Sequence, residues 1–286
     1  VGIGRNVLVA NTTGTSNVAV GAFALDANTT ADQNTAIGYN ALTANTTGTN
    51  NTAVGSEALE AVTDSEYNTA VGRGAGQAIT TGDYNTFIGG QAGQATTTAS
   101  NNTAVGLNAL VANTTGTGNT AIGKSSGEGI TTGDFNTTLG IAGAAITTGD
   151  RNTAVGYNAL VTATTAANNV AVGSGALQVN TSGTYNTAVG TFALDANTDA
   201  GYNTAVGYNA LTGNTTGAAN TAVGTTALGS ATTADNNTAV GSLALLLNTT
   251  GAANTAVGQN SLYNNSTASN NTAVGKGALE ANTTGA

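Results

Sequence analysis

Apolar and polar residues alternate over short stretches of this chain, and the same alternation returns with a period of 17 residues. The repeat reads N-T-A-V-G-x-x-A-L-x-x-N-T-T-G-x-x, and its positions are numbered from the first Asn. The 16 copies begin at Asn17, Asn34, Asn51, Asn68, Asn85, Asn102, Asn119, Asn136, Asn152, Asn169, Asn186, Asn203, Asn220, Asn237, Asn254 and Asn271. Only the step from Asn136 to Asn152 differs, at 16 residues. So strict a period predicts one supersecondary unit stacked on itself.

Each repeat predicts one coil with two β-rich stretches, at positions 1–4 and about 7–13, joined by turns at the fifth-position Gly and at T-T-G. Coils stacked in register hydrogen-bond to one another at ~4.8 Å. The expected fold is all-β, a parallel β-solenoid (β-roll) of about 17 coils. We expect one continuous repeat domain over 1–286, with variant coils at 68–151. Because the chain begins within a repeat and without Met, we also expect a segment of a longer protein.

The pattern also predicts which residues form the core. Position 2 is nearly always Thr, but Val18 and Val170 replace it, which indicates a packed and largely apolar environment. Positions 2 and 4 lie on one side of an extended segment and position 3 on the other. We therefore expect positions 2 and 4 to face the core. The predicted core residues are Val54, Val105, Val155, Val206 and Val257 at position 4, with Leu42, Leu110 and Leu211 at position 9.

A substitution within the chain supports such a core. Position 9 is Leu in 12 of the 16 repeats, and the other four carry Gly76, Gly93, Gly127 and Gly143. In those coils position 12 changes from Asn to Ile79, Thr96, Ile130 and Ile146. An Ile three residues later can refill the volume that a missing Leu leaves. Positions 9 and 12 are therefore predicted to share interior space.

The Asn at position 1 is predicted to form an amide ladder, in which stacked side chains hydrogen-bond from coil to coil. Its members include Asn34, Asn51, Asn68, Asn102, Asn203 and Asn254. A row of ligand-binding or catalytic Asn side chains is the alternative interpretation.

Position 3 is Ala in 14 of the 16 repeats, with Phe87 and Thr138 as exceptions. A solvated strand face normally carries larger polar residues, so a column restricted to Ala indicates that something packs closely against it. We expect this column to be a contact between identical chains. It includes Ala36, Ala53, Ala104, Ala205 and Ala256.

Composition narrows the function. The chain has no His, Cys, Met, Trp or Pro, so the commonest general base and the soft metal ligands are missing. Five Lys+Arg against 14 Asp+Glu give a net charge of −9, which argues against nucleic acid and anionic membranes as partners. No apolar run approaches the ~20 residues of a membrane span. We expect no enzyme activity, catalytic residues, cofactor or metal.

Acids, aromatics and glycosylation motifs are the remaining candidates for chemistry. Acids precede the repeat Asn at Asp32, Glu66, Asp83, Asp134, Asp150 and Asp235, either as solvated turn residues or as a weak cation site. Aromatic residues recur at position 17 as Tyr67, Tyr84, Phe135, Tyr185 and Tyr202, and at position 6 as Tyr39, Tyr157 and Tyr208. These rows suit turn packing, a subunit contact or stacking on glycans. Asn-x-Thr acceptor motifs occur at Asn11, Asn28, Asn45, Asn101, Asn113 and Asn248, most of them within the N-T-T-G turn.

The motif N-T-A-V-G-x-x-A-L-x-x-N-T-T-G resembles the repeats of bacterial and phage tail-fibre-like proteins. It is also similar to the YadA-type head repeats of trimeric autotransporter adhesins, which carry A-[IV]-G. The resemblance covers essentially all of 1–286. It implies a parallel β-roll, a homotrimer, and a place outside the cell, on the cell surface or on the virion.

We therefore expect a structural and adhesive fibre segment, such as a stalk, a surface filament or a tail fibre. We expect it to associate with identical chains, including end to end, and to contact surface glycans. Two alternatives remain open. An ice-binding β-solenoid fits the low charge, abundant Thr and strict period, although adjacent Thr residues of T-T-G point to opposite sides. A carbohydrate-binding module fits the aromatic rows.

Overall fold

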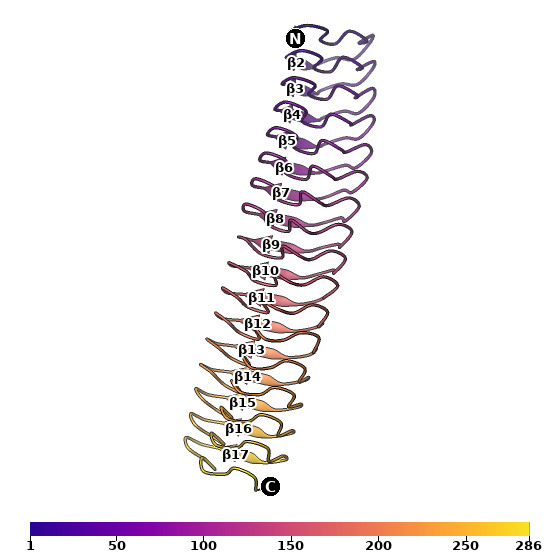
Figure 1. Cartoon of the computed structure of the whole chain (residues 1–286). Coiled ribbons are helices and arrows are strands. Elements are labelled where there is room, and N and C mark those ends of the chain that lie inside the picture. Colours follow the sequence, from indigo (N-terminus) through magenta and orange to yellow (C-terminus); the bar gives the residue numbers. More distant parts are fainter. Residues whose placement is uncertain (286) are drawn as a thin grey trace. The chain divides into compact units, whose positions relative to one another are not determined.

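The computed structural model describes residues 1–285, and every regular element in that range is a short β-strand. The chain forms two compact units, Val1–Ile141 and Ala142–Ala286. Within each unit the backbone winds through a series of similar coils, and each coil contributes one strand (Figure 1). The fold is thus an all-β parallel solenoid, which confirms the fold class predicted from the repeat.

The strands coincide with the T-A-V segment of each repeat, at positions 2–4. The first unit contains β1 (Gly2–Ile3), β2 (Val18–Val20), β3 (Thr35–Ile37), β4 (Thr52–Val54), β5 (Thr69–Val71), β6 (Thr86–Ile88), β7 (Thr103–Val105), β8 (Thr120–Ile122) and β9 (Thr137–Leu139). The second contains β10 (Thr153–Val155), β11 (Val170–Val172), β12 (Thr187–Val189), β13 (Thr204–Val206), β14 (Thr221–Val223), β15 (Thr238–Val240), β16 (Thr255–Val257) and β17 (Thr272–Val274).

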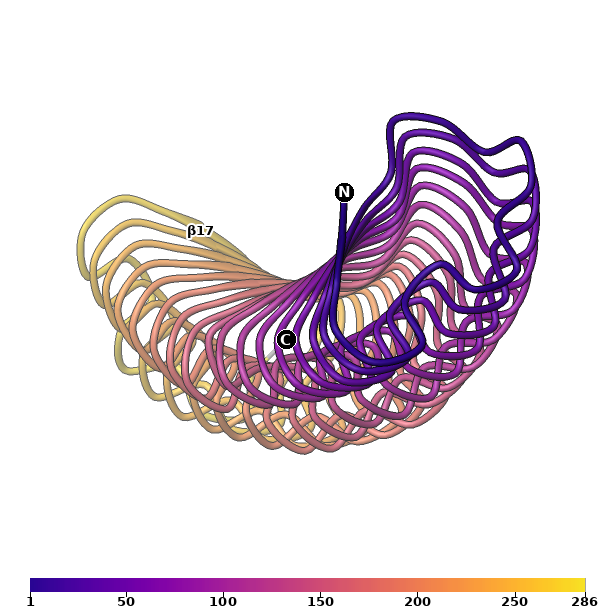
Figure 2. The same ribbon diagram turned by 90° about the horizontal axis from the view of Figure 1, so that it is seen from above.

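Within each unit, consecutive strands pair in parallel, and each residue pairs with the residue 17 positions later. Thr52 pairs with Thr69, for example, and Ala53 with Ala70. The loops bond in the same direction, as in the 2.9 Å hydrogen bond that the Thr46 amide donates to the carbonyl of Thr63. Seen along the stack, each coil is turned slightly from the one before it (Figure 2), as the twist of β-strands requires. Identical positions therefore form columns through each unit.

The second β-rich stretch predicted for each coil is absent, because positions 7 and 9 adopt the left-handed conformation. Asn40 has φ 55° and Leu42 has φ 53°, and the same values recur from coil to coil. Asn tolerates this conformation well, whereas Leu adopts it at a cost. The chain turns here instead of extending, and this bend brings the Leu side chain into the coil.

Two structural constraints require Gly at position 5. Gly55 has φ 141°, which side chains rarely allow. A Cβ built on it would also lie 2.5 Å from the carbonyl oxygen of Gly72 in the next coil. These two constraints explain why every repeat holds Gly at this turn.

The prediction of which strand face is buried was wrong. The Ala residues at position 3, including Ala36, Ala53, Ala104, Ala205 and Ala256, are fully buried inside their own coil. The predicted core residues Val54, Val105, Val155 and Val257 are only half-buried, and Val206 is 37% exposed. Position 4 therefore points outward with position 2, and the Ala column cannot serve as a contact between chains. Thr and Val share a shape that suits either face, so their exchange at position 2 did not identify the interior.

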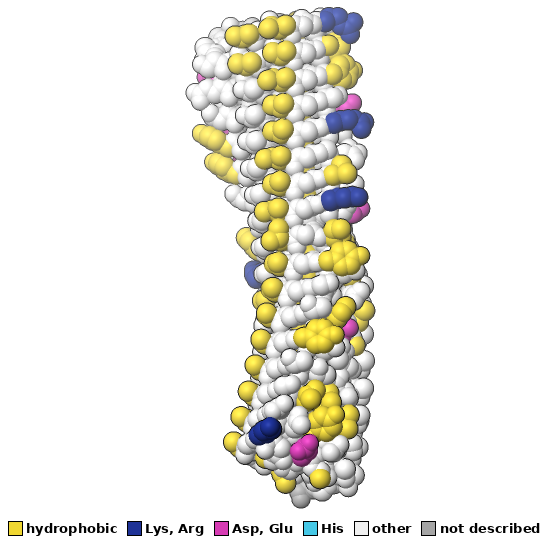
Figure 3. Space-filling model, turned by 90° about the vertical axis from the view of Figure 1, so that its left-hand side faces the viewer, with side chains coloured by type: hydrophobic (Ala, Val, Ile, Leu, Met, Phe, Trp, Pro, Cys, Tyr) yellow, Lys and Arg dark blue, Asp and Glu magenta, His cyan; other side chains and the backbone are white. Residues whose placement is uncertain are grey.

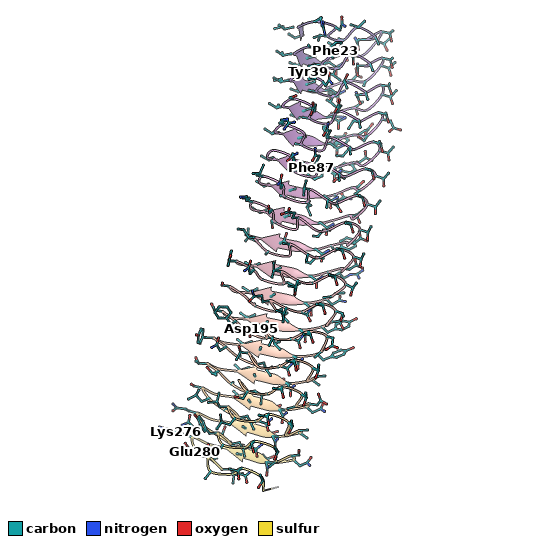
Figure 4. All side chains as sticks on the ribbon, in the orientation of Figure 1. Phe23, Tyr39, Phe87, Asp195, Lys276 and Glu280 are labelled. Carbon is teal, nitrogen blue, oxygen red and sulfur yellow. The ribbon has the colours of Figure 1, made fainter. Side chains whose placement is uncertain are left out.

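The coil interior is thin, which is why position 3 is Ala. In the coil that begins at Asn85, position 3 is Phe87, and its ring atom Cζ lies 2.5 Å from where a Cβ of Gly93 would be. Position 3 therefore faces position 9 across the coil, and a large residue at one place excludes a large residue at the other. Phe87 is fully buried inside the first unit (Figure 4).

The predicted exchange between positions 9 and 12 is confirmed. Leu42, Leu110 and Leu211 are fully buried, as are Ile79, Ile130 and Ile146. The Cδ1 atom of Ile79 lies 3.2 Å from a Cβ built on Gly76, and that of Ile130 lies 3.0 Å from one built on Gly127. The isoleucines thus occupy the space that Leu takes in ordinary coils.

Position 3 contributes to this exchange as well, which the sequence analysis did not foresee. A Cβ on Gly76 would lie 2.9 Å from the Phe87 ring of the next coil, and one on Gly127 would lie 3.1 Å from the hydroxyl of Thr138. The two exceptions to Ala at position 3 therefore border Gly at position 9.

Candidate functional site

The Asn column at position 1 closes each coil and joins it to the next. Asn51 is fully buried, and its Nδ2 donates a 2.8 Å hydrogen bond to the carbonyl of Ser65, at the end of the same coil. Its Oδ1 accepts a 3.0 Å hydrogen bond from the backbone amide of Asn68 in the next coil. The same two bonds are made by Asn34, Asn68, Asn102, Asn203 and Asn254.

The predicted ladder is therefore present, with one difference in its bonding. Its continuous link is amide oxygen to backbone N–H, and direct bonds between side-chain amides occur only in some coils, as at 3.0 Å from Asn85 to Asn68. Because both polar ends of these buried side chains are engaged, the arrangement stabilises the coil.

Sequence reasoning missed a second Asn ladder, at position 12. Asn28 donates to Oδ1 of Asn11 at 2.7 Å, and Asn45 donates to Oδ1 of Asn28 at 3.2 Å. Each Nδ2 also bonds the carbonyl three residues later, as from Asn45 to Gly48 at 3.0 Å. The recurrence of N-T-T-G was the signal for it. Because Asn28, Asn45, Asn113 and Asn248 are fully buried, these acceptor motifs are inaccessible in the folded chain.

The second ladder leaves amide oxygens without a partner where it is interrupted. Among the described residues, Oδ1 of Asn45, Asn113 and Asn214 is buried and accepts no hydrogen bond. The next coil holds Val62, Ile130 and Ala231 at this position, and none of these side chains can donate. The orphaned oxygens thus mark the ends of ladder segments.

In several coils the acid before the repeat Asn accepts hydrogen bonds from the turn of the preceding coil. Asp32 Oδ1 accepts hydrogen bonds from the Thr15 amide and, at 2.9 Å, from its hydroxyl. These bonds hold the pKa of Asp32 below its ordinary value, the amide contributing more than the hydroxyl. Asp83 and Asp235 accept in the same way from the amides of Glu66 and Ala218. This arrangement matches the interpretation of turn residues.

Exposed aromatic rings stack on each other along the column at position 17. The rings of Tyr67 and Tyr84 are 5.3 Å apart at an angle of 8°, and those of Tyr185 and Tyr202 are 5.2 Å apart at 10°. Each pair covers one face of each ring. At one end of the first unit, Phe23 and Tyr39 in neighbouring coils meet edge to face (Figure 4), with ring centroids 6.2 Å apart. These rings therefore contact one another between coils, while Tyr67, Tyr84, Tyr185 and Tyr202 remain 50–66% exposed.

The strands leave one surface uncovered, made by positions 2 and 4 and called here the outer strand face. Within each unit, position 4 forms a column of Val and Ile with one Leu, which stands out in the space-filling view (Figure 3). Ile37, Ile122 and Leu139 are 39%, 41% and 44% exposed. The outer strand face is therefore the main apolar surface that repeats in every coil.

No cavity that could enclose a ligand occurs among residues 1–285, and no group of three or more metal-ligating side chains gathers there. The described part of the chain also contains no helix long and apolar enough to cross a membrane.

Comparison with known proteins leaves the family open. No protein-family model matches the chain, and neither a curated protein nor a solved structure is detectably similar to it.

Proposed function

We propose that the chain is a structural segment of an extracellular fibre, on a cell surface or virion, made of identical chains. The observation that supports this is the bonding along each unit. Within a unit, each internal coil is joined to its neighbours by parallel strand pairs, loop hydrogen bonds and the Asn ladder. Such bonding repeats the same contacts at every step and makes a segment whose length grows with the number of repeats.

The adhesive part of the proposal rests on the resemblance of the repeat to tail-fibre and YadA-type head repeats. In this proposal the coils present side chains at a fixed spacing to glycans on another surface. Binding of the purified chain to a glycan array tests this contact. The homotrimer is part of the same proposal.

Electron microscopy of the purified chain and antibody labelling of intact cells or virions test this function. We expect elongated particles and labelling from outside without permeabilisation. Compact particles, or labelling only after the envelope is opened, would contradict the proposal.

Ice binding is a second candidate because of one specific observation. The Thr residues at position 2 form a column on the outer strand face, beside the column at position 4. The T-T-G residues, which weakened this hypothesis at the level of the sequence, are not the ones involved. Thermal hysteresis of the purified chain distinguishes this function from a structural one.

A further inference from the structure

The outer strand face is a parallel sheet surface without a cover from its own chain. Strands in parallel sheets are normally packed on both faces, and here the coil interior covers only the side of Ala at position 3. We propose that the outer strand face is the contact between identical chains, which lie parallel to one another with equivalent coils at the same level. This inference rests on the proposed fibre function and names the partner that the uncovered face takes.

The composition of this face suits a protein contact. Val206 and Val223, on neighbouring strands β13 and β14, are each 37% exposed, and position 4 is Val, Ile or Leu in all 16 repeats. Contiguous exposed apolar surface marks interaction sites in soluble proteins. All 14 acids and all five bases lie at positions 6, 7, 10, 14, 16 and 17, so none occupies this face. Two such faces therefore meet without burying charge, although each chain carries a net charge of −9.

The periodicity of the face identifies its occupant. Within each unit the apolar column continues from coil to coil (Figure 3), so a partner must present apolar groups at the same spacing over many coils. A second copy of this chain does so at each step, because its own column has the same spacing between strands. A partner without this repeat would contact only a few coils and leave the rest of the column exposed.

Charges beside the face indicate the relative direction of the two chains. Arg73 and Lys124 lie at position 6, after the column of position 4, whereas Asp83 and Asp134 of the same coils lie at position 16, before the next strand. In Figure 3 most Lys and Arg side chains lie on one side of the apolar column and one lies on the other side, while Asp and Glu side chains are visible on both sides. When two faces meet in parallel, the position-6 cations of one chain lie beside the position-16 acids of the other. Antiparallel chains would bring like flanks together.

The same face is less suited to ordered water. Its column mixes Val, Ile and Leu139, so its height varies from coil to coil, and Val18 and Val170 remove the hydroxyl from the Thr column. A protein partner can repack around such differences, whereas an ice lattice has fixed positions.

Native mass, measured on the full chain over a concentration series, tests the contact. The variant combines Val206→Glu with Val223→Glu, and the matched control combines Thr216→Glu with Thr233→Glu at exposed sites of the coils that follow these strands. We expect the wild type and the control to have a mass of several chains and the valine variant to have the mass of one. Circular dichroism should show all three folded. If the glutamates prevent folding, Val206→Thr with Val223→Thr keeps the side-chain shape and should weaken assembly instead.

Disulfide formation tests the direction, because the chain has no Cys of its own. Parallel packing predicts that Val54→Cys and Val257→Cys each link to the same residue of another chain on mild oxidation. Thr216→Cys, away from the face, should remain a thiol. If Thr216→Cys forms a disulfide between chains while Val54→Cys and Val257→Cys do not, the parallel packing is overturned.

A folded wild type with the mass of one chain at every concentration would also overturn the inference, and so would assembly that survives in the valine variant. Thermal hysteresis in such a monomer, lost in the valine variant, would assign the face to ice. Assembly through this face into compact particles would leave the inference intact and contradict the fibre.

Discussion

Single residues show how this chain satisfies buried polar groups without charge. Asn serves at two buried columns because its side chain donates and accepts, so one residue type links a coil to itself and to its neighbour. The interruptions in the second column are equally informative, since they leave amide oxygens that a single substitution should satisfy.

Ala231→Asn is predicted to stabilise the chain by about 1 kcal/mol, the usual net value of one buried hydrogen bond. The new Nδ2 would donate to the orphaned Oδ1 of Asn214, and the new Oδ1 would accept from Asn248 in the following coil. Thermal unfolding measures the effect. Ala231→Leu has the same branched shape but is larger and cannot donate, and it should destabilise; equal effects of the two substitutions would show that the hydrogen bonds do not matter.

Asp32 is predicted to make stability depend on pH. Its pKa is lowered in the folded state by Thr15, so its contribution is complete above the ordinary Asp pKa of about 3.9 and is lost as the pH falls through the folded value. Melting curves from pH 6 to pH 2 compare the wild type with Asp32→Asn, which accepts hydrogen bonds without titrating. The difference between the two should change only at the acid end, and a difference constant with pH would contradict this.

At the scale of one coil, the short distance between position 3 and position 9 limits which side chains fit in the core. Ala at position 3 and Leu at position 9 fill the usual coil, and Phe87 opposite Gly93 fills the variant. The combined side-chain volume of positions 3 and 9 stays similar, but the large residue is at position 9 in the usual coil and at position 3 in the variant.

This exchange predicts coupling between Phe87 and Gly93. Phe87→Ala should cost about 3–5 kcal/mol because it leaves a cavity, and Gly93→Leu should cost about 1–3 kcal/mol because its side chain meets the ring. Together they restore the ordinary Ala–Leu pair and should cost clearly less than the sum. Chemical denaturation of the four proteins completes the cycle, and additive costs would show that the residues do not share space.

At the scale of the whole molecule, the surface consists of columns with different chemistry. Charges lie beside the apolar column and not within it, so the proposed contact between chains combines an uncharged centre with charged edges. The two parts respond differently to salt.

We predict that the assembled mass persists in ~1 M NaCl, where the Debye length is ~3 Å and exposed charge pairs are screened. The apolar centre should hold the chains together, while the rate of assembly should fall because edge charges no longer steer the encounter. Light scattering after a jump in salt concentration measures both quantities. Dissociation into single chains at high salt would show that the edges, and not the apolar column, hold the assembly.

The sequence by itself determined the period, the parallel stacking and the position-1 Asn ladder, because each follows from a residue that recurs at one spacing. It also predicted that Ile79, Ile130 and Ile146 replace Leu in the core, since missing volume must be refilled nearby. Alternation shows which residues share a face but not which face is inside. Thr and Val fit both a buried and a half-exposed strand, so only the short distance between position 3 and position 9 decided that Ala points inward. Because Ala points inward, Val54 and Val206 at position 4 point outward and form part of the outer strand face.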